Sequence, residues 1–252
     1  MKKTPADAAP VEVKDLRKSF GEQKVLDGIT LRVAPGETVA ILGRSGTGKS
    51  VLLKLMIGLQ SPDSGSVRIA GQEITNLDVN QLNEVRKKVG FLFQKAALYD
   101  SLTVEQNVAF PLKRHSDMSE GEQKERVREL LESVGMQEDQ QKMPSDISGG
   151  MQKRVGLARA LALDPEILLF DEPTAGLDPI TAAEIGKLVL DLKKKRKITV
   201  VVVTHDVRGA KVMSDRMVLI HEGSIVAEGS FEELQKKRNR FVAQFIADGA
   251  EE

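Results

Sequence analysis

Residues 43–50 read Gly43-Arg44-Ser45-Gly46-Thr47-Gly48-Lys49-Ser50, which is the pattern GxxxxGKS. They follow the apolar run Thr38-Val39-Ala40-Ile41-Leu42, which predicts a buried strand, and a helical pattern starts at Ser50. A strand, a glycine-rich turn and a helix in this order predict a loop whose backbone N–H groups surround phosphate oxygens. In such a loop Lys49 would reach the β- and γ-phosphates and Ser50 would ligate Mg²⁺. These eight residues therefore predict a binding site for a nucleoside triphosphate.

Composition narrows the classes of protein. The 37 basic and 37 acidic residues balance, so bulk charge gives no reason to expect a nucleic-acid partner. The absence of cysteine excludes disulfides and thiolate metal sites and is typical of a reducing compartment. The first ten residues lack the apolar core of a secretory signal, and no window has the roughly 18 apolar residues of a membrane-spanning helix. We therefore expect a soluble, cytosolic protein.

Hydrophobic patterning predicts the organisation of the chain. Residues 1–10 are expected to be a disordered tail, and residues 11–40 to hold antiparallel strands that lead to the strand before the glycine loop. Residues 95–164 have a helical character, including a capping box at Ser119 and Glu122 and a second helix from about Gly149 to Leu163. Apolar runs then return at 167–170 and 198–203, as in a parallel sheet. The expected fold is α/β, a nucleotide-binding core with an antiparallel β-subdomain and an inserted helical subdomain.

A second motif ends the apolar run Ile167-Leu168-Leu169-Phe170 with two carboxylates, Asp171 and Glu172. A buried strand that ends in aspartate can place this carboxylate beside a phosphate loop, where it would hold Mg²⁺. Glu172 could then face the attacking water as a general base. The alternative, a strand that ends in solvated acids, is less favoured beside the glycine loop.

A third motif is Ser148-Gly149-Gly150, which opens a helix and predicts a second anion site made of backbone N–H groups. The chain thus has two phosphate-binding surfaces but only one GxxxxGKS loop. The simplest explanation is a dimer in which this serine loop closes on the nucleotide of the other protomer.

These motifs together resemble the ATP-binding cassette (ABC) family, and the resemblance covers nearly the whole chain. Ser148-Gly149-Gly150 is similar to the family's signature loop, with Ile147 where leucine is usual and Met151 where glutamine is usual. The resemblance implies a P-loop NTPase of the ABC type with a RecA-like core. It also implies a single ABC domain over residues 11–233, a helical subdomain at about 95–164 and a C-terminal tail at 234–252. In this tail Phe241, Phe245 and Ile246 share one helical side, which predicts that the segment docks on this chain or on the partner ATPase.

The resemblance assigns further residues to the nucleotide site. Phe20 lies where the family stacks an aromatic ring on adenine, although by itself it would more often be a core residue. Gln94 matches the glutamine that contacts Mg²⁺ or water, although without the resemblance it reads as a polar strand end. Asp178 matches the loop that communicates across the dimer. His205 follows a strand end and matches the histidine that contacts the γ-phosphate and helps to position Glu172.

The implied activity is hydrolysis of ATP with Mg²⁺, coupled to transport across a membrane. A chromosome-maintenance ATPase of this superfamily carries a long coiled coil, for which the span from Ser50 to Ser148 is too short, and a translation-associated one carries two cassettes. We therefore expect the motor subunit of a transporter. It would work with an integral-membrane permease and a second copy of itself, as a peripheral protein on the cytoplasmic face of the inner membrane.

The kind of transporter is indicated by weaker features. Residues 92–104, 107–112, 178–181 and 241–246 are similar to ATPases of lipid transporters of the Mla type, whose partners carry MCE (mammalian cell entry) domains. Phospholipid transport, with an MCE-domain lipid-binding protein as a further partner, is the expected function. The alternatives are an importer of amino acids or other small solutes and a system that extracts lipoproteins. Residues 95–112 match the region that receives the permease, with Ala97, Leu98 and Tyr99 as contacts or, alternatively, as core.

Overall fold

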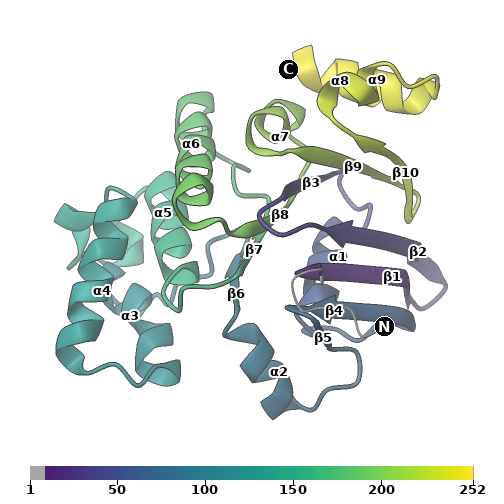
Figure 1. Ribbon diagram of the computed structural model, residues 1–252. Helices are drawn as coiled ribbons and strands as arrows, with labels where there is room; N and C mark the ends of the chain where they lie inside the picture. The colour runs from purple at the N-terminus through teal and green to yellow at the C-terminus, as the bar shows by residue number, and fades with distance from the viewer. Residues whose placement is uncertain (1–8, 252) are drawn as a thin grey trace.

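The computed structural model describes residues 9–251, without the side chains of residues 194–196 and 250–251 (Figure 1). Within this range the chain forms a four-stranded and a six-stranded sheet. The first sheet has the order β2-β1-β4-β5 and its neighbours are antiparallel. Its strands are β1 (Val11–Phe20), β2 (Gln23–Val33), β4 (Ser64–Ile69) and β5 (Gln72–Glu73).

The six-stranded sheet carries the nucleotide-binding motifs. Its order is β10-β9-β3-β8-β7-β6, and all neighbours are parallel except the β10–β9 pair. Its strands are β3 (Thr38–Leu42), β6 (Val89–Leu92), β7 (Ile167–Asp171), β8 (Thr199–Thr204), β9 (Arg216–His221) and β10 (Ser224–Gly229).

The central strands are buried on both faces because apolar residues occupy most of their positions, with threonines and Asp171 only at strand ends. Leu169 of β7 and Val201 of β8 join the core on one face, whereas Phe170 and Val202 join the core on the other. This division follows from the two-residue period of a strand. Continuous apolar runs of this kind are typical of parallel sheets covered on both sides.

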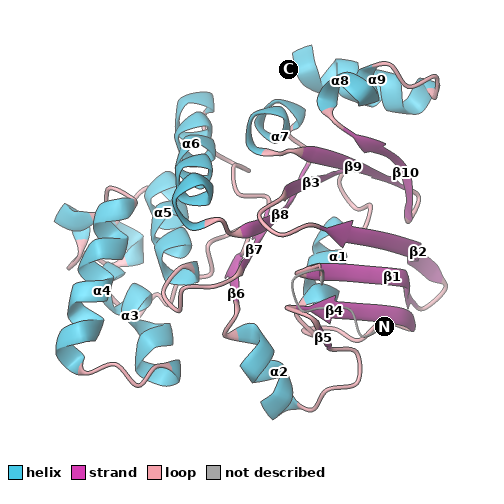
Figure 2. Cartoon of the chain, in the orientation of Figure 1, coloured by secondary structure: helices cyan, strands magenta, loops and turns pink. Residues whose placement is uncertain are grey.

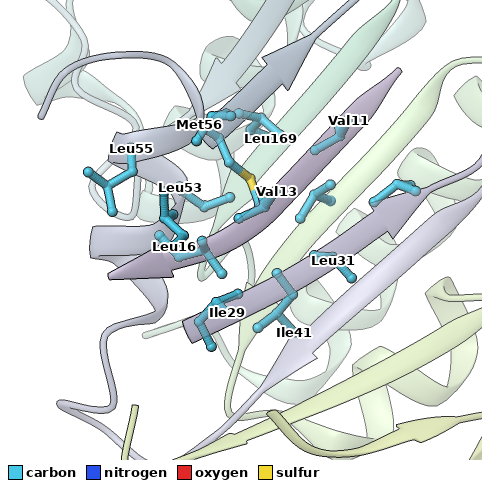
Figure 3. Packing of buried hydrophobic residues seen from close by; sticks show 14 of the residues in the cluster. Val11, Val13, Leu16, Ile29, Leu31, Ile41, Leu53, Leu55, Met56 and Leu169 are labelled. Carbon is cyan, nitrogen blue, oxygen red and sulfur yellow. The ribbon is translucent and has the colours of Figure 1, made fainter. Parts of the chain in front are cut away.

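Helix α1 (Lys49–Met56) lies between the two sheets and fills the first core (Figure 3). Leu53 and Met56 of α1 pack in the same cluster as Val13 of β1, Ile41 of β3 and Leu169 of β7. The helix that starts at the glycine loop is thus held rigidly between two layers, and this fixes the orientation of its N-terminus.

The remaining helices pack on the other face of the large sheet, on the first core or against one another. Figure 2 shows α3, α4 and α5 as a helical group at one side of the molecule, away from the antiparallel sheet. The three helices lie inside the segment 95–164 that the sequence analysis expected to be helical. The helices other than α1, including the two short 3₁₀ helices η2 and η3, are α2 (Val79–Arg86), α3 (Val104–His115), α4 (Glu120–Ser133), η2 (Gln137–Asp139), η3 (Pro144–Asp146), α5 (Gly149–Ala160), α6 (Pro179–Arg196), α7 (Val207–Met213), α8 (Phe231–Gln235) and α9 (Arg240–Glu251).

Two boundaries near the N-terminus and in the helical segment differ from those expected. Residues 1–8 of the predicted tail lie outside the described residues, but Ala9 is buried and the Pro10 carbonyl accepts a hydrogen bond from Ala70 N at 2.8 Å. Helix α5 ends at Ala160 rather than near Leu163. The chain has to leave the helix before Pro165, and Asp164 accordingly adopts a left-handed φ of 53°.

The C-terminal segment, which was predicted to dock on this chain or on a partner, packs on this chain. Leu234 of α8 and both Val242 and Ile246 of α9 are fully buried, in a cluster with residues of β3, β9 and α7. Helix α9 therefore docks on its own chain in this structure. The reason is its apolar stripe, which covers an end of the large sheet that α1 and α5 leave open.

Candidate nucleotide site

The predicted site residues come together at one edge of the large sheet. Strands β3, β6, β7 and β8 are parallel, so their carboxyl ends lie at the same edge. The glycine loop follows β3, Gln94 follows β6, Asp171 ends β7 with Glu172 directly after it, and His205 follows β8. The open sheet thereby places residues that are up to about 160 positions apart in sequence around a single crevice.

The glycine loop bends sharply into the N-terminus of α1. Gly48 is the N-cap residue of α1 and has a left-handed φ of 90°. A Cβ atom there would lie 2.8 Å from Val25 Cγ1 and 2.9 Å from the Val25 carbonyl oxygen, so a side chain would collide with β2. Only glycine fits this position, and the loop N–H groups and the positive end of α1 are available for an anion.

Lys49 is buried, at 6% exposure, and lies across the loop. Its Nζ donates to the carbonyls of Gly43 at 2.8 Å and Arg44 at 3.0 Å, and lies 3.7 Å from Glu172 Oε1. Burial lowers the pKa of Lys49, while the carboxylates of Glu172 and Asp171 oppose this shift. The ammonium group is thus held where phosphate oxygens above the loop can replace the carbonyls as its partners.

A hydroxyl and a carboxylate meet beside this lysine. Ser50 Oγ donates to Asp171 Oδ1 at 2.7 Å, and Asp171 is 6% exposed. No group of three or more histidines, aspartates and glutamates suited to a metal is found in the described part of the chain. One hydroxyl and one carboxylate fit Mg²⁺ bound with a nucleotide, because Mg²⁺ takes its other oxygens from phosphates and water. When bound, Mg²⁺ neutralises charge on the phosphates.

Glu172 and His205 form the second polar pair of the site. His205 Nδ1 lies 3.0 Å from Glu172 Oε2, and the His205 backbone N–H points at the same oxygen at 3.4 Å. The glutamate is 8% exposed and has a left-handed φ of 49°. A non-glycine residue in this conformation is strained by about 1–3 kcal/mol, and such strain concentrates at functional sites.

The predicted adenine-stacking residue is on the surface. Phe20 ends β1 and is 46% exposed, so the alternative that it belongs to the core is wrong. Its ring lies 5.4 Å from Lys18 Nζ and presents an accessible aromatic face. Gln94 is exposed as well.

The signature loop lies next to the loop that contains Asp178. Ser148 is the N-cap residue of α5 and its hydroxyl accepts a hydrogen bond from Met151 N at 3.3 Å; Ser148 and Gly149 are exposed. A Cβ atom on Gly150 would lie 2.5 Å from Thr181 Cγ2, so α5 and α6 begin side by side. The Asp178 carboxylate caps α6, and the hydroxyl of Thr181, together with backbone N–H groups, lowers its pKa.

One residue of the site was missed by the sequence analysis. Lys153 of α5 is 4% exposed and donates to the carbonyl of Glu172 at 3.0 Å and to the carbonyl of Gln94. A signal was present in the sequence, since Lys153 shares a helical face with the small residues Gly156 and Ala160. Small residues let neighbouring segments lie close to this face of α5, as they do at Gly156, so a lysine on it lies near their backbones.

Comparison with known proteins agrees with this geometry. The family model described as "ABC transporter" matches residues 26–175. The chain is 43% identical to the probable ribonucleotide transport ATP-binding protein mkl of Mycobacterium leprae (94% of this chain, 68% of that protein), and 44% identical to the methionine import ATP-binding protein MetN of Brucella abortus (91% and 62%). The dimeric, post-hydrolysis structure of the ATP-binding cassette MJ0796 with ADP and Pi superposes with a TM-score of 0.81 at 36% identity, covering 87% of this chain and 98% of that one.

The chain therefore belongs to the ABC transporter family. It is an ATP-binding cassette of the P-loop NTPase fold that hydrolyses ATP with Mg²⁺, and its kind of subunit works with a membrane permease. The chain spans about two thirds of the length of these curated relatives, from 62% to 68%. Among residues 9–251, none of the helices has both the length and the hydropathy that crossing a bilayer demands.

Proposed function

We propose that the Glu172–His205 pair performs the chemistry of ATP hydrolysis. Glu172 accepts a proton from water as the water oxygen attacks the γ-phosphorus and the bond to the β-phosphate oxygen breaks, giving ADP and phosphate. His205 orients the Glu172 carboxylate from the solvent side. The observation that carries this assignment is the 3.0 Å contact between the two side chains at the same sheet edge as the glycine loop.

The remaining site residues would bind the substrate. Lys49 and the N–H groups of residues 43–48 hold the β- and γ-phosphates, and the exposed ring of Phe20 stacks on adenine. Ser50 and Asp171 would ligate Mg²⁺, and Gln94 would contact it or the attacking water.

We further propose that two copies enclose ATP between them. Ser148 and Gly149 are exposed at the N-terminus of α5, so their backbone N–H groups are free to meet the γ-phosphate held by another chain. Asp178 starts α6 beside this loop and would report the occupancy of one site to the other. The dimeric arrangement of the similar cassette MJ0796 supports the same proposal.

The permease would dock on the helical group. A cavity of about 440 Å³ is lined by Phe93, Ala97, Tyr99 and Phe110, among others. Ala97 is exposed and Tyr99 is 46% exposed, with its ring 4.6 Å from that of Phe110, whereas Leu98 is partly buried against the second core. Ala97 and Tyr99 are thus available for contact with a permease at the cytoplasmic face of the inner membrane. Leu98 instead packs against the core and anchors this segment.

The transported substrate we propose is a phospholipid, moved by a transporter with an MCE-domain partner. The support for this substrate is the resemblance of residues 92–112 to the ATPases of Mla-type systems. An importer of amino acids or other small solutes is the second candidate, since a methionine import ATPase is 44% identical to this chain. Both candidates share the ATPase chemistry, because substrate selection lies in the permease and its partners.

One experiment separates these candidates. The protein is isolated with its native partners from detergent-solubilised membranes, and the co-purifying chains and lipids are identified by mass spectrometry. Recovery of a permease with an MCE-domain protein and phospholipid is expected. A permease with a solute-binding protein would contradict lipid transport and support import of a small molecule. Tyr99→Arg is a matched variant that should lose the permease but keep its ATPase activity.

A further inference from the structure

Lys153 is a buried cation that the proposed hydrolysis scheme does not use. It lies in α5, five residues after Ser148, and only 4% of its surface is exposed. Both of its hydrogen-bond acceptors, the oxygens of Glu172 and Gln94, are backbone carbonyls. An ammonium group is costly to bury, so its retention there requires these acceptors. Burial lowers the pKa of Lys153, against the influence of the nearby carboxylates of Asp171 and Glu172.

Both segments that Lys153 contacts have strained backbones. Glu172 has a left-handed φ of 49°, and Ala96 and Ala97, which follow Gln94, have φ values of 56° and 49°. Strained conformations of non-glycine residues persist only where the surroundings hold them. Lys153 supplies one such hold at each segment, because it donates to the carbonyls of Glu172 and Gln94.

Helix α5 makes further contacts with the segment that follows β6. Arg159 donates to the carbonyls of Ala96 and Ala97, each at 2.7 Å. A Cβ atom on Gly156 would lie 2.8 Å from Leu92 Cδ1 and 3.2 Å from the Ala96 Cβ, so α5 lies directly against this segment. Helix α5 thus links three parts of the molecule: the exposed loop at Ser148, the backbone of Glu172 and the segment that follows β6.

We propose that Lys153 is a positioning residue for hydrolysis, which fixes the Glu172 backbone relative to the Gln94 segment so that the carboxylate faces the attacking water. Lys153 would act through Glu172, since its hydrogen bonds go to backbone carbonyls of the Glu172 and Gln94 segments. Movement of α5, which carries Ser148, would reach the catalytic carboxylate by this route. The proposal rests on the role of Glu172, and its test distinguishes the two.

The test compares Lys153→Met with Arg154→Met, using ATPase kinetics and ATP binding by calorimetry. Arg154 is the matched control: it is the next residue of α5 and donates to the Val134 carbonyl at 3.1 Å and to Glu184 at 2.6 Å, away from the site. For Lys153→Met we expect kcat to fall on the order of 100-fold, the effect of a misplaced catalytic group, with KM and the ATP dissociation constant within about threefold of the original values. Arg154→Met should retain kcat.

A second variant, Lys153→Gln, keeps the proposal testable if Lys153→Met does not fold. Lys153→Gln keeps two N–H donors without the charge, and we expect it to retain several times the kcat of Lys153→Met. Wild-type kcat in folded Lys153→Met, or an equal loss in Arg154→Met, would overturn the proposal. A loss of ATP affinity in Lys153→Gln as large as its loss of kcat would also overturn the proposal.

The Glu172→Gln background separates this proposal from the role of Glu172 itself. Adding Lys153→Met to Glu172→Gln should produce no further fall in kcat, because the group being positioned is already absent. A further fall of the same size as in the wild type would show that Lys153 acts independently and overturn the proposal. Wild-type turnover in Glu172→Gln alone would refute the glutamate assignment instead.

Discussion

The carboxylate of Glu172 is 10% exposed, and it is contacted at 3.0 Å by the imidazole of His205, which is 63% exposed. The two residues directly follow neighbouring parallel strands, β7 and β8, so the sheet holds their backbones together. A buried carboxylate is thus contacted by an imidazole that is itself exposed to solvent. His205 can orient Glu172 without itself being removed from water.

Replacement of His205 tests this relationship. In His205→Ala we expect kcat to fall on the order of 100-fold with little change in KM, because the carboxylate loses its orientation but the phosphate loop is intact. Steady-state ATPase kinetics measure both constants. His115 is an exposed histidine at the end of α3, so His115→Ala is the control and should behave as the wild type. An unchanged kcat in His205→Ala would remove the histidine from the mechanism.

Replacement of Glu172 separates binding from hydrolysis. Glu172→Gln preserves the shape of the side chain but removes the base, so we expect ATP to bind while turnover falls by about 10²–10⁴-fold. Because the bound ATP then persists, a closed dimer should accumulate. Size-exclusion chromatography with ATP and with ADP measures the dimer fraction. A variant that hydrolyses ATP at the original rate would show that another group accepts the proton.

The Ser50–Asp171 pair predicts a specific dependence on Mg²⁺. In Asp171→Asn we expect the Mg²⁺ concentration for half-maximal activity to rise about 10–100-fold, because an amide oxygen replaces the carboxylate ligand. Titration of activity with Mg²⁺ at saturating ATP measures this concentration. Asp146→Asn, in η3, is a control outside the site. A Mg²⁺ dependence that stays unchanged in Asp171→Asn would contradict the proposed ligand.

The lowered pKa of Lys49 predicts uptake of a proton on binding ATP. Burial holds this pKa below 10.5 in the free protein, and the phosphates of ATP raise it again. At alkaline pH below 10.5 the free lysine is partly deprotonated, so ATP binding takes up a proton, and ATP affinity falls as pH rises through the lowered pKa. Calorimetry in two buffers of different ionisation enthalpy measures the uptake. In Lys49→Met the uptake should disappear and ATP should bind more weakly; if uptake persists, the proton goes elsewhere.

Helix α9 predicts a contribution of the C-terminal segment to stability. Ile246 is fully buried against residues of α7, α8 and the large sheet, so Ile246→Ala should lower the free energy of unfolding by about 2–5 kcal/mol. Denaturant unfolding followed by circular dichroism measures this change. Gln244→Ala, two residues earlier on the exposed side of α9, should change it by less than about 0.5 kcal/mol. Equal effects in both variants would indicate that α9 does not dock as described.

The glycine loop of the site could be predicted from sequence because its residues are consecutive in the chain. A buried strand, the glycines at 43, 46 and 48, and the pair Lys49-Ser50 follow one another in the chain, and this order predicts the loop and the start of α1. Asp171 was equally accessible to prediction, because an apolar run that ends in a carboxylate indicates a strand end at the sheet edge. Phe20, by contrast, was assigned through the family resemblance, and its exposure emerged only from the structure.

The sequence by itself determined the glycine loop, the buried parallel strands and the carboxylates at their ends, because these follow from the spacing of neighbouring residues. Only the tertiary structure decided which distant groups meet. Lys153 lies 19 positions from Glu172 and 59 from Gln94, yet it donates to both carbonyls. Helix α9 likewise packs on α7, α8 and the sheet of its own chain rather than on a partner, a choice that its apolar side alone left open. Local periodicity can indicate which side of a helix is buried, but it does not specify the partner elements on which that side packs or to which it donates hydrogen bonds.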